Sequence, residues 1–245
     1  MKIDKKAASL IIKKQTQQNK MSQMSMAVFN QQAPERAYLE HFINTVYQKY
    51  YQANITHFYP HLLSIEDPEN NKIKAVAGLR CAQEETLFSE HYLPESLETT
   101  LKGIYQQDIL RSQIVEVGNL APANVGQMRW LIASITSFLH AAGYQYIVFT
   151  LVTGVINAFK KMGVPLQQIC EAKHANLPAE AKKQWGHQYY NLNPMVLTGD
   201  INLVYHLLED NIRQYNQNLM PLFEKAYQLG LDFKANKQNI MGQVA

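Results

Sequence analysis

A single acidic residue within an apolar strand is the feature of this sequence that points most directly to chemistry. Glu116 lies in the otherwise apolar run 114–120. Because side chains alternate along a strand, Glu116 shares a face with Gly118. Burying a carboxylate there is costly unless it is paired, and burial raises its pKa toward the range in which a general base works. A structural glutamate paired with Arg80 or Arg111 explains the pattern equally well.

The residues after Glu116 indicate a place for a ligand. Glycine within a strand, here Gly118, often marks a bulge or the close approach of a ligand. The loop from Ala121 to Gly126 precedes a predicted helix, whose free N–H groups favour an anion, and Arg129 lies in its first turn. This loop has one glycine and no phosphate-binding motif, so a plain strand-to-helix connection is slightly favoured.

Polar residues also follow a second predicted strand. Thr150 and Thr153 lie at its C-terminal end, and Asn157 lies on the helix behind it. Open α/β sheets bind ligands at this end of their strands, so all three are candidate substrate contacts. Helix capping by Thr153 is an equally good explanation of that residue.

The histidines and cysteines predict no metal site. His57 and His61 are four residues apart, but Pro60 and the predicted strand prevent a helical pair of metal ligands. Cys81 and Cys170 lie in no Cys-x-x-Cys pattern and are interpreted as buried free thiols, with a single disulfide between them left open.

A strand, helix and strand unit must position these candidates. We expect strands at 114–120 and 146–150, joined by a helix over 127–142 that Gly143 ends. Such a crossover makes the two strands parallel and central. A preceding hairpin of 61–65 and 73–81 makes the sheet mixed. Around this core the sequence predicts a helix from Pro34, a short strand at 55–58, helices after Pro94 and over 155–162, a strand or helix at 166–173, and a helical tail from 200 to 231.

The composition fits one large domain with a terminal segment at each end. Hydrophobic residues make up 47% and charged residues 18% of the 245 residues, so a sizeable core can form. We expect a disordered basic leader over 1–33, an α/β domain over 34–200 and a helical C-terminal extension over 201–245. The leader is rich in Lys, Gln, Ser and Met, a composition that buries little surface.

Charge and hydropathy argue against two classes of partner. The net charge is only +3 and its excess lies in the leader, so no nucleic-acid surface is predicted. No run reaches the roughly 18 apolar residues that a membrane span needs. The apolar run 7–12 is too short for a secretion signal, which indicates a cytoplasmic protein. Peripheral membrane contact through the basic leader stays open.

Several motifs occur together in a recognisable order. The run from Glu116 to Ala121, with Arg111 upstream, resembles the central motif of the thermostable hemolysin family. Other matching segments follow the same order, namely 50–53, 58–60, 77–80, 87–93 with Glu98, 149–150, 185–186, 189–190, Pro194 and 199–200. Lys173 departs from the pattern, where an acidic residue is expected.

That family is similar to GNAT-like acyltransferases, and among them to the acyl-homoserine-lactone synthases. The resemblance implies an α/β (α+β) fold with a mixed central sheet, whose central strands part to grip an acyl-pantetheine arm. It also implies an amine that attacks a thioester while backbone N–H groups of the Glu116 strand hold the carbonyl oxygen. Asn119 stands where the lactone synthases carry an arginine, so their amine substrate is not assumed here.

The candidate residues then fall into three roles. Glu116 is the predicted base or orients the amine, and Tyr92 and Tyr190 are weaker candidates to protonate the leaving thiolate. Arg80, Arg111 and Glu90 are predicted to hold the substrate. The acyl-pantetheine arm is expected to contact Val117, Gly118, Asn119, Leu120, Ala121, Gly126, Arg129, Thr150 and Asn157.

We therefore expect a transferase without a bound cofactor, which takes a fatty acyl group from a thioester to a small amine or amino acid. The glycine-poor loop 121–126 favours an acyl carrier protein as donor, with acyl-coenzyme A second. Such a product is a surfactant, which would account for lysis by a protein without a span. A directly lytic protein and an inactive module that binds acyl carrier protein remain the alternatives.

Overall fold

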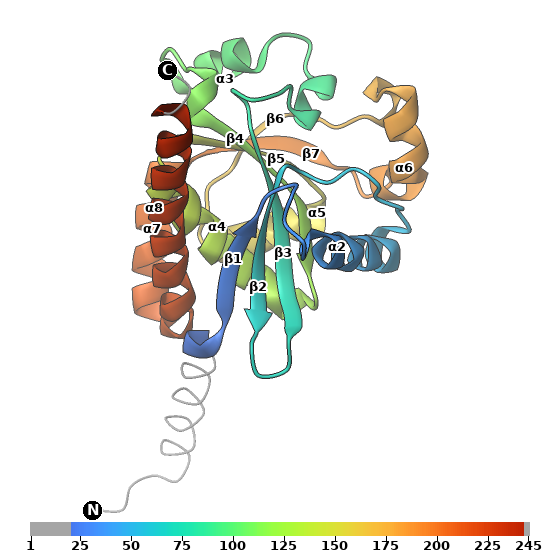
Figure 1. Cartoon of the computed structure of the whole chain (residues 1–245). Coiled ribbons are helices and arrows are strands. Elements are labelled where there is room, and N and C mark those ends of the chain that lie inside the picture. The colour runs from blue at the N-terminus through green and yellow to red at the C-terminus, as the bar shows by residue number, and fades with distance from the viewer. Residues whose placement is uncertain (1–20, 243–245) are drawn as a thin grey trace, which may run out of the picture.

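The computed structural model describes residues 21–242, which form one mixed sheet between two layers of helices (Figure 1). The seven strands have the order β1-β2-β3-β4-β5-β7-β6. Their bounds are β1 (Ser25–Phe29), β2 (His61–Asp67), β3 (Lys72–Cys81), β4 (Ile114–Pro122), β5 (Tyr146–Leu151), β6 (Gln167–Glu171) and β7 (Met195–Asp200). β4 and β5 pair in parallel, and the other neighbours pair antiparallel. The prediction of a mixed sheet with a parallel βαβ centre is confirmed.

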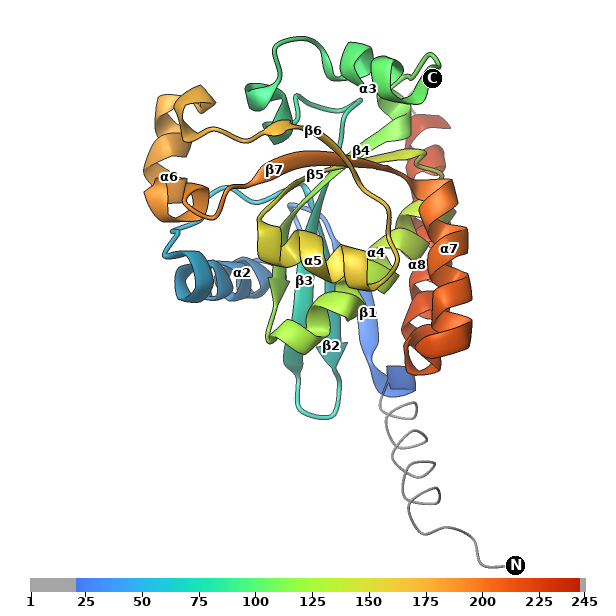
Figure 2. The ribbon, with the colours of Figure 1, turned by 180° about the vertical axis from the view of Figure 1, so that it is seen from behind.

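Helices cover both faces of the sheet. The helix bounds are α2 (Arg36–Tyr51), α3 (Leu97–Tyr105), α4 (Met128–Ala142), α5 (Thr153–Lys161), α6 (Ala179–Tyr190), α7 (Ile201–Tyr215) and α8 (Met220–Gly242). α4, α5, α7 and α8 lie on one face (Figure 2), and α2, α3 and α6 lie over the other. α4 is apolar on nearly every side because α8 packs against the side that faces away from the sheet. Gly143, at φ 87°, ends α4 as predicted.

The predicted leader is wrong for residues 21–33, and residues 1–20 lie outside the described part. β1 pairs antiparallel with β2, and the side chains of Met21 and Met24 are buried in the main core. The Lys225 ammonium on α8 donates to the carbonyl oxygens of Ser22 and Met24. Methionine is flexible and fills irregular core gaps, so this segment buries more surface than its composition suggests.

Three weaker predictions have mixed outcomes. Residues 55–58 do not form a strand, and β2 pairs instead with β1 and β3. Residues 167–171 form the edge strand β6 rather than a helix. The predicted C-terminal helices exist as α7 and α8, with Pro221 in the first turn of α8, where proline is tolerated. Leu222 and Phe223 of α8 belong to the same core as the sheet, and residues 243–245 lie outside the described part.

The pairing of β4 with β5 ends before either strand ends. The parallel register runs from Ile114 with Tyr146 to Val117 with Phe149, whereas β4 continues to Pro122. On the other side, β4 gains one residue relative to β3 between the pairs Gly78–Gly118 and Val76–Ala121. Asn119 lies at this bulge with φ 47°. The bulge turns β4 away from β5, so the two strands part at their C-terminal ends.

Candidate active site

The Glu116 carboxylate is enclosed at the centre of the sheet. Its side chain is 0% exposed, and its two oxygens accept the backbone N–H groups of Phe88 (2.8 Å) and Ser89 (2.7 Å). Burial raises its pKa, while the positive charge of Arg80 and the N–H donors act in the opposite direction. Glu116 is therefore both a hydrogen-bonded structural carboxylate and a group with a raised pKa, so the two interpretations of the sequence are compatible.

The N–H donors belong to the short 3-10 helix η1 (Phe88–Tyr92), which a charged cluster holds in place. Arg111 binds both oxygens of Glu90 at 2.9 Å and also reaches Glu98 at 3.2 Å. Glu90 in turn accepts the Leu87 N–H at 2.7 Å. Arg111 thus pairs with Glu90 and Glu98 rather than with Glu116. These contacts give Arg111 and Glu90 a structural role beside the predicted substrate binding.

Tyr59 is a site residue that the sequence analysis placed only within a motif. Tyr59 lies over two facing glycines, with its ring at Gly118 and its Cβ at Gly78: a Cβ on Gly118 would meet Tyr59 Cζ at 2.7 Å, and one on Gly78 would meet Tyr59 Cβ at 2.9 Å. The Arg80 guanidinium lies 4.4 Å from the ring centroid. Paired glycines on adjacent strands are the sequence signal that predicts a large ring above them.

The Tyr59 hydroxyl remains protonated at neutral pH. Burial raises its pKa well above the ordinary value, the charge of Glu116 raises it further, and Arg80 acts in the opposite direction. The side chain is only half-buried, whereas Glu116 is fully enclosed. Tyr59 therefore has some exposed surface where Glu116 has none.

The predicted tyrosine donors lie together on the flank of the site. The Tyr92 and Tyr190 hydroxyls are 2.6 Å apart. Burial raises both pKa values, that of Tyr190 to about 12, so both hydroxyls keep their protons. Phe88 and Trp185 pack beside them, with ring centroids 5.8 Å apart. The structure brings the two hydroxyls together, and their role as proton donors stays a prediction.

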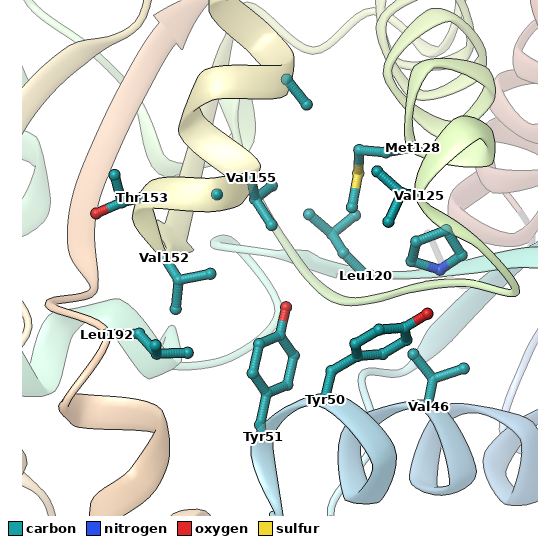
Figure 3. A pocket seen from close by; sticks show the side chains of 13 residues that line it. Val46, Tyr50, Tyr51, Leu120, Val125, Met128, Val152, Thr153, Val155 and Leu192 are labelled. Carbon is teal, nitrogen blue, oxygen red and sulfur yellow. The ribbon is translucent and has the colours of Figure 1, made fainter.

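An apolar cavity of about 360 Å³ opens where β4 and β5 part (Figure 3). Tyr50 and Tyr51 from α2 face Leu120 and Val155 across it. The other lining residues are Val46, Pro122, Val125, Met128, Val152, Thr153, Gly154, Ala158 and Leu192. Its volume is within the usual range for ligand pockets, and its lining suits an alkyl chain or a pantetheine arm.

The predicted acyl-pantetheine residues divide around this cavity. Leu120 lines it, whereas the side chains of Val117 and Ala121 are buried in the core, so these two offer only their backbone. The Thr150 hydroxyl is buried without a hydrogen-bond partner among the described residues. Asn157 lies in a separate depression with Lys160.

Two further residues of that set lie at the start of α4. Gly126 is exposed, and Arg129 is half-buried with a buried Nε that has no hydrogen-bond partner in the described part of the chain. Neither residue lines the apolar cavity.

Other kinds of site are lacking from the residues that can be described. Within 21–242, no three His, Cys, Asp or Glu side chains gather closely enough to hold a metal ion. No helix in the same range is both long and apolar enough to cross a membrane. Cys81 and Cys170 are both free thiols, the first buried and the second half-buried.

Comparison with solved structures defines the class of fold. The chain is similar to the acyl-homoserine-lactone synthase LasI, with a TM-score of 0.52 and 10% identity over 76% of this chain and 95% of that one. It is also similar to BjaI, a CoA-dependent acyl-homoserine lactone synthase solved with SAM and isopentyl-CoA, with a TM-score of 0.50 and 13% identity over 78% and 90% of the two chains. Comparison with the sequences of curated proteins gives no match. The chain therefore has the fold of these synthases, a mixed sheet whose central parallel strands part.

The sequence also identifies the family. The pattern of the thermostable hemolysin family matches residues 29–205, which is most of the chain and includes every strand after β1. The chain belongs to the thermostable hemolysin family. The resemblance predicted from the motifs is therefore confirmed.

Proposed function

We propose that this protein is an N-acyltransferase that moves a fatty acyl group from a carrier thioester to a small amine or amino acid. The supporting observation is one strand, β4, which holds a buried carboxylate of raised pKa four residues before it reaches an apolar cavity at Leu120. A general base beside a site for an acyl chain is what aminolysis of a thioester requires.

Each part of the site has a role in this reaction. The cavity binds the acyl-pantetheine arm where β4 and β5 part. Backbone N–H groups of β4 beyond Val117 are no longer paired with β5, and they hold the thioester carbonyl oxygen as negative charge develops on it. Glu116 accepts the proton of the attacking amine and later gives it up to the leaving thiolate, for which the Tyr92–Tyr190 pair is the alternative donor.

The start of α4 supports an acyl carrier protein as the donor. The N–H of Ala123 donates to the Lys74 carbonyl at 2.8 Å, and that of Asn124 donates to Gln127 Oε1 at 3.1 Å. Two backbone donors of this loop are therefore already in use, which leaves fewer for a coenzyme A pyrophosphate, whereas a carrier protein presents a single phosphodiester. Such a reaction would take place in the cytoplasm, and its surfactant product connects the family name with this chemistry.

The test is a measurement of thiol release. The full-length protein is mixed with a long-chain acyl carrier protein or acyl-coenzyme A, together with amino acids and polyamines. We expect release that needs an amine and that falls at least tenfold in Glu116→Gln. Glu209→Gln, a surface carboxylate paired with Arg213, is the matched control and should retain full activity.

Other results would redirect the proposal. Release without an amine would indicate a thioesterase. No release from any donor would leave a carrier-binding module or a directly lytic protein, and lysis of cells by the pure protein without a donor would distinguish these two.

A further inference from the structure

The carboxylate of the proposed base, Glu116, is not directly accessible to a substrate. Glu116 has no exposed surface, and its oxygens already accept the N–H groups of Phe88 and Ser89. Gly118, two residues further on the same face of β4, offers no side chain in the way, but the Tyr59 ring fills that space. The Tyr59 hydroxyl, which a Cβ on Gly118 would meet at 2.8 Å, thus lies on the same face of β4 as Glu116 and next to its carboxylate.

We propose that the Tyr59 hydroxyl relays the proton between the amine and Glu116, an inference that rests on the proposed function. The neutral amine nitrogen bonds to the thioester carbonyl carbon and passes its proton to the Tyr59 oxygen, as the tyrosine proton passes to Glu116. The C–S bond then breaks, and the proton returns from Glu116 through the same hydroxyl to the leaving thiolate. The products are an amide and a free thiol, and both side chains regain their starting protonation.

Hydrogen bonds to both the N–H and the carbonyl fix the backbone of Tyr59, although the residue lies in a loop. Its N–H donates to Asn119 Oδ1 at 3.0 Å, and its carbonyl accepts from Arg36 at 2.6 Å. Asn119 adopts φ 47°, which is uncommon outside glycine. Arg36 is 7% exposed, also donates to the Pro60 carbonyl at 2.9 Å and pairs with Glu40 at 2.7 Å, so a partly buried ion pair holds this turn.

The ring of Tyr59 is fixed as tightly as its backbone. Gly118 leaves space for the ring, since a Cβ there would lie 2.7 Å from Tyr59 Cζ, and Gly78 leaves space for Tyr59 Cβ, which a Cβ there would meet at 2.9 Å. Arg80 lies over its face at 4.4 Å. A relay needs a hydroxyl held within hydrogen-bond reach of both partners, and these restraints act on this one side chain.

The charges around Tyr59 favour transfer in both directions. Arg80 on β3 and Glu116 on β4 face it directly, and the neutral hydroxyls of Tyr47 on α2 and Tyr92 on η1 lie further off. Because the tyrosine pKa is raised, the hydroxyl carries a proton at every pH at which the enzyme would work, so no free tyrosinate competes with Glu116.

The variant Tyr59→Phe tests this proposal in the full-length protein. It keeps the ring on Gly118 and under Arg80, so the fold is retained. We expect kcat for amine-dependent thiol release to fall at least tenfold, with KM for the amine changed less than twofold. The acid limb of the pH–rate profile, which follows Glu116 in the wild type, should shift to the ionisation of the amine itself.

The control is Tyr105→Phe, which removes another half-buried hydroxyl, one bonded to Thr198 at 3.2 Å, away from the cleft. It should keep the wild-type kcat and pH profile. An active wild type with an unchanged Tyr59→Phe variant would overturn the relay and leave the proposed function intact. A variant that raises KM alone would also overturn it, because Tyr59 would then only bind the amine. No release by the wild type would overturn the function and the relay together.

Discussion

Strand β4 contributes to two regions of the molecule, the surroundings of Glu116 and the apolar cavity at Leu120, and these two regions are built differently. Around Glu116 and Gly118, the Tyr59 ring and the η1 backbone are held by named hydrogen bonds and by glycines that leave no spare space. A few residues further on, beyond Leu120, the cavity is lined almost wholly by apolar side chains. The region around Glu116, the reaction centre, fixes the positions of individual groups, whereas the cavity restricts little more than the size and shape of what binds there. Changes in the first should therefore affect the rate, and changes in the second should affect the choice of donor.

The largest effect is expected for Gly118→Ala, which breaks the geometry of the centre. The new Cβ would lie 2.7 Å from Tyr59 Cζ, so the ring must move. Misplacement by about 1 Å can cost roughly a hundredfold in rate, and we expect a loss of that order in amine-dependent thiol release. Gly103→Ala, in open space on α3, is the control and should keep full activity with about 0.5–1 kcal/mol more stability. Equal activity of the two variants would contradict a crowded centre.

The next effect concerns the support behind the centre. Arg111→Ala removes the charged hydrogen bonds to Glu90 and Glu98 and frees η1. Hydrogen bonds to charged groups contribute about 1.5–3 kcal/mol, so denaturant titration should show a loss of about 2 kcal/mol in the free energy of unfolding. Arg213→Ala removes a surface pair and should cost less than about 0.5 kcal/mol. Similar losses in both variants would show that the Arg111 cluster is an ordinary surface network.

The cavity should respond through donor choice. Ala158→Phe places a ring in the space that we assign to the acyl chain. We expect kcat/KM for a long-chain donor to fall about tenfold relative to a short-chain donor, which corresponds to about 1.4 kcal/mol. The short-chain donor is the internal control, measured with the same protein. A uniform loss for both donors would argue that the chain binds elsewhere.

The smallest effect is the pH dependence of stability. Burial raises the Glu116 pKa above 4.5, so between pH 4.5 and the raised value the folded protein holds a proton that the unfolded chain releases. The contribution of Glu116 to stability is present in full below pH 4.5 and is lost as the pH rises through the folded pKa. The free energy of unfolding of the wild type, measured relative to Glu116→Gln, should therefore decline over this window. A relative stability that rises with pH would mean that the N–H donors outweigh burial.

The centre was predictable where its signal is local. The strand around Glu116 and the helix that Gly143 ends follow from alternation and helix-stop chemistry, which depend on neighbouring residues. Because these residues also set the strand order, the parallel core of the fold followed from them.

The rest of the centre depends on contacts between distant residues. Tyr59 and Asn119 are 60 residues apart, and Glu90 and Arg111 are 21 apart, so spacing carries no signal for either pair. The sequence does not predict the edge strand β1, because composition averaged over a lysine-rich segment conceals a five-residue strand whose burial does not alternate clearly. The facing glycines 78 and 118 were the one available signal for Tyr59, and using it required the strand register.

The contact between β1 and α8 has a consequence for how the protein is made. Lys225 binds the carbonyl of Met24 across 201 residues of sequence. At typical translation rates of roughly 5–20 residues per second, a ribosome takes about 10–40 s to synthesise the intervening chain. In the later part of that time, after α4 has been made and before α8 emerges, the outer side of α4 lies open to water. The nascent chain thus exposes for several seconds an apolar helix that can aggregate. Avoiding aggregation depends on chaperones or on rapid packing of α8 once it emerges.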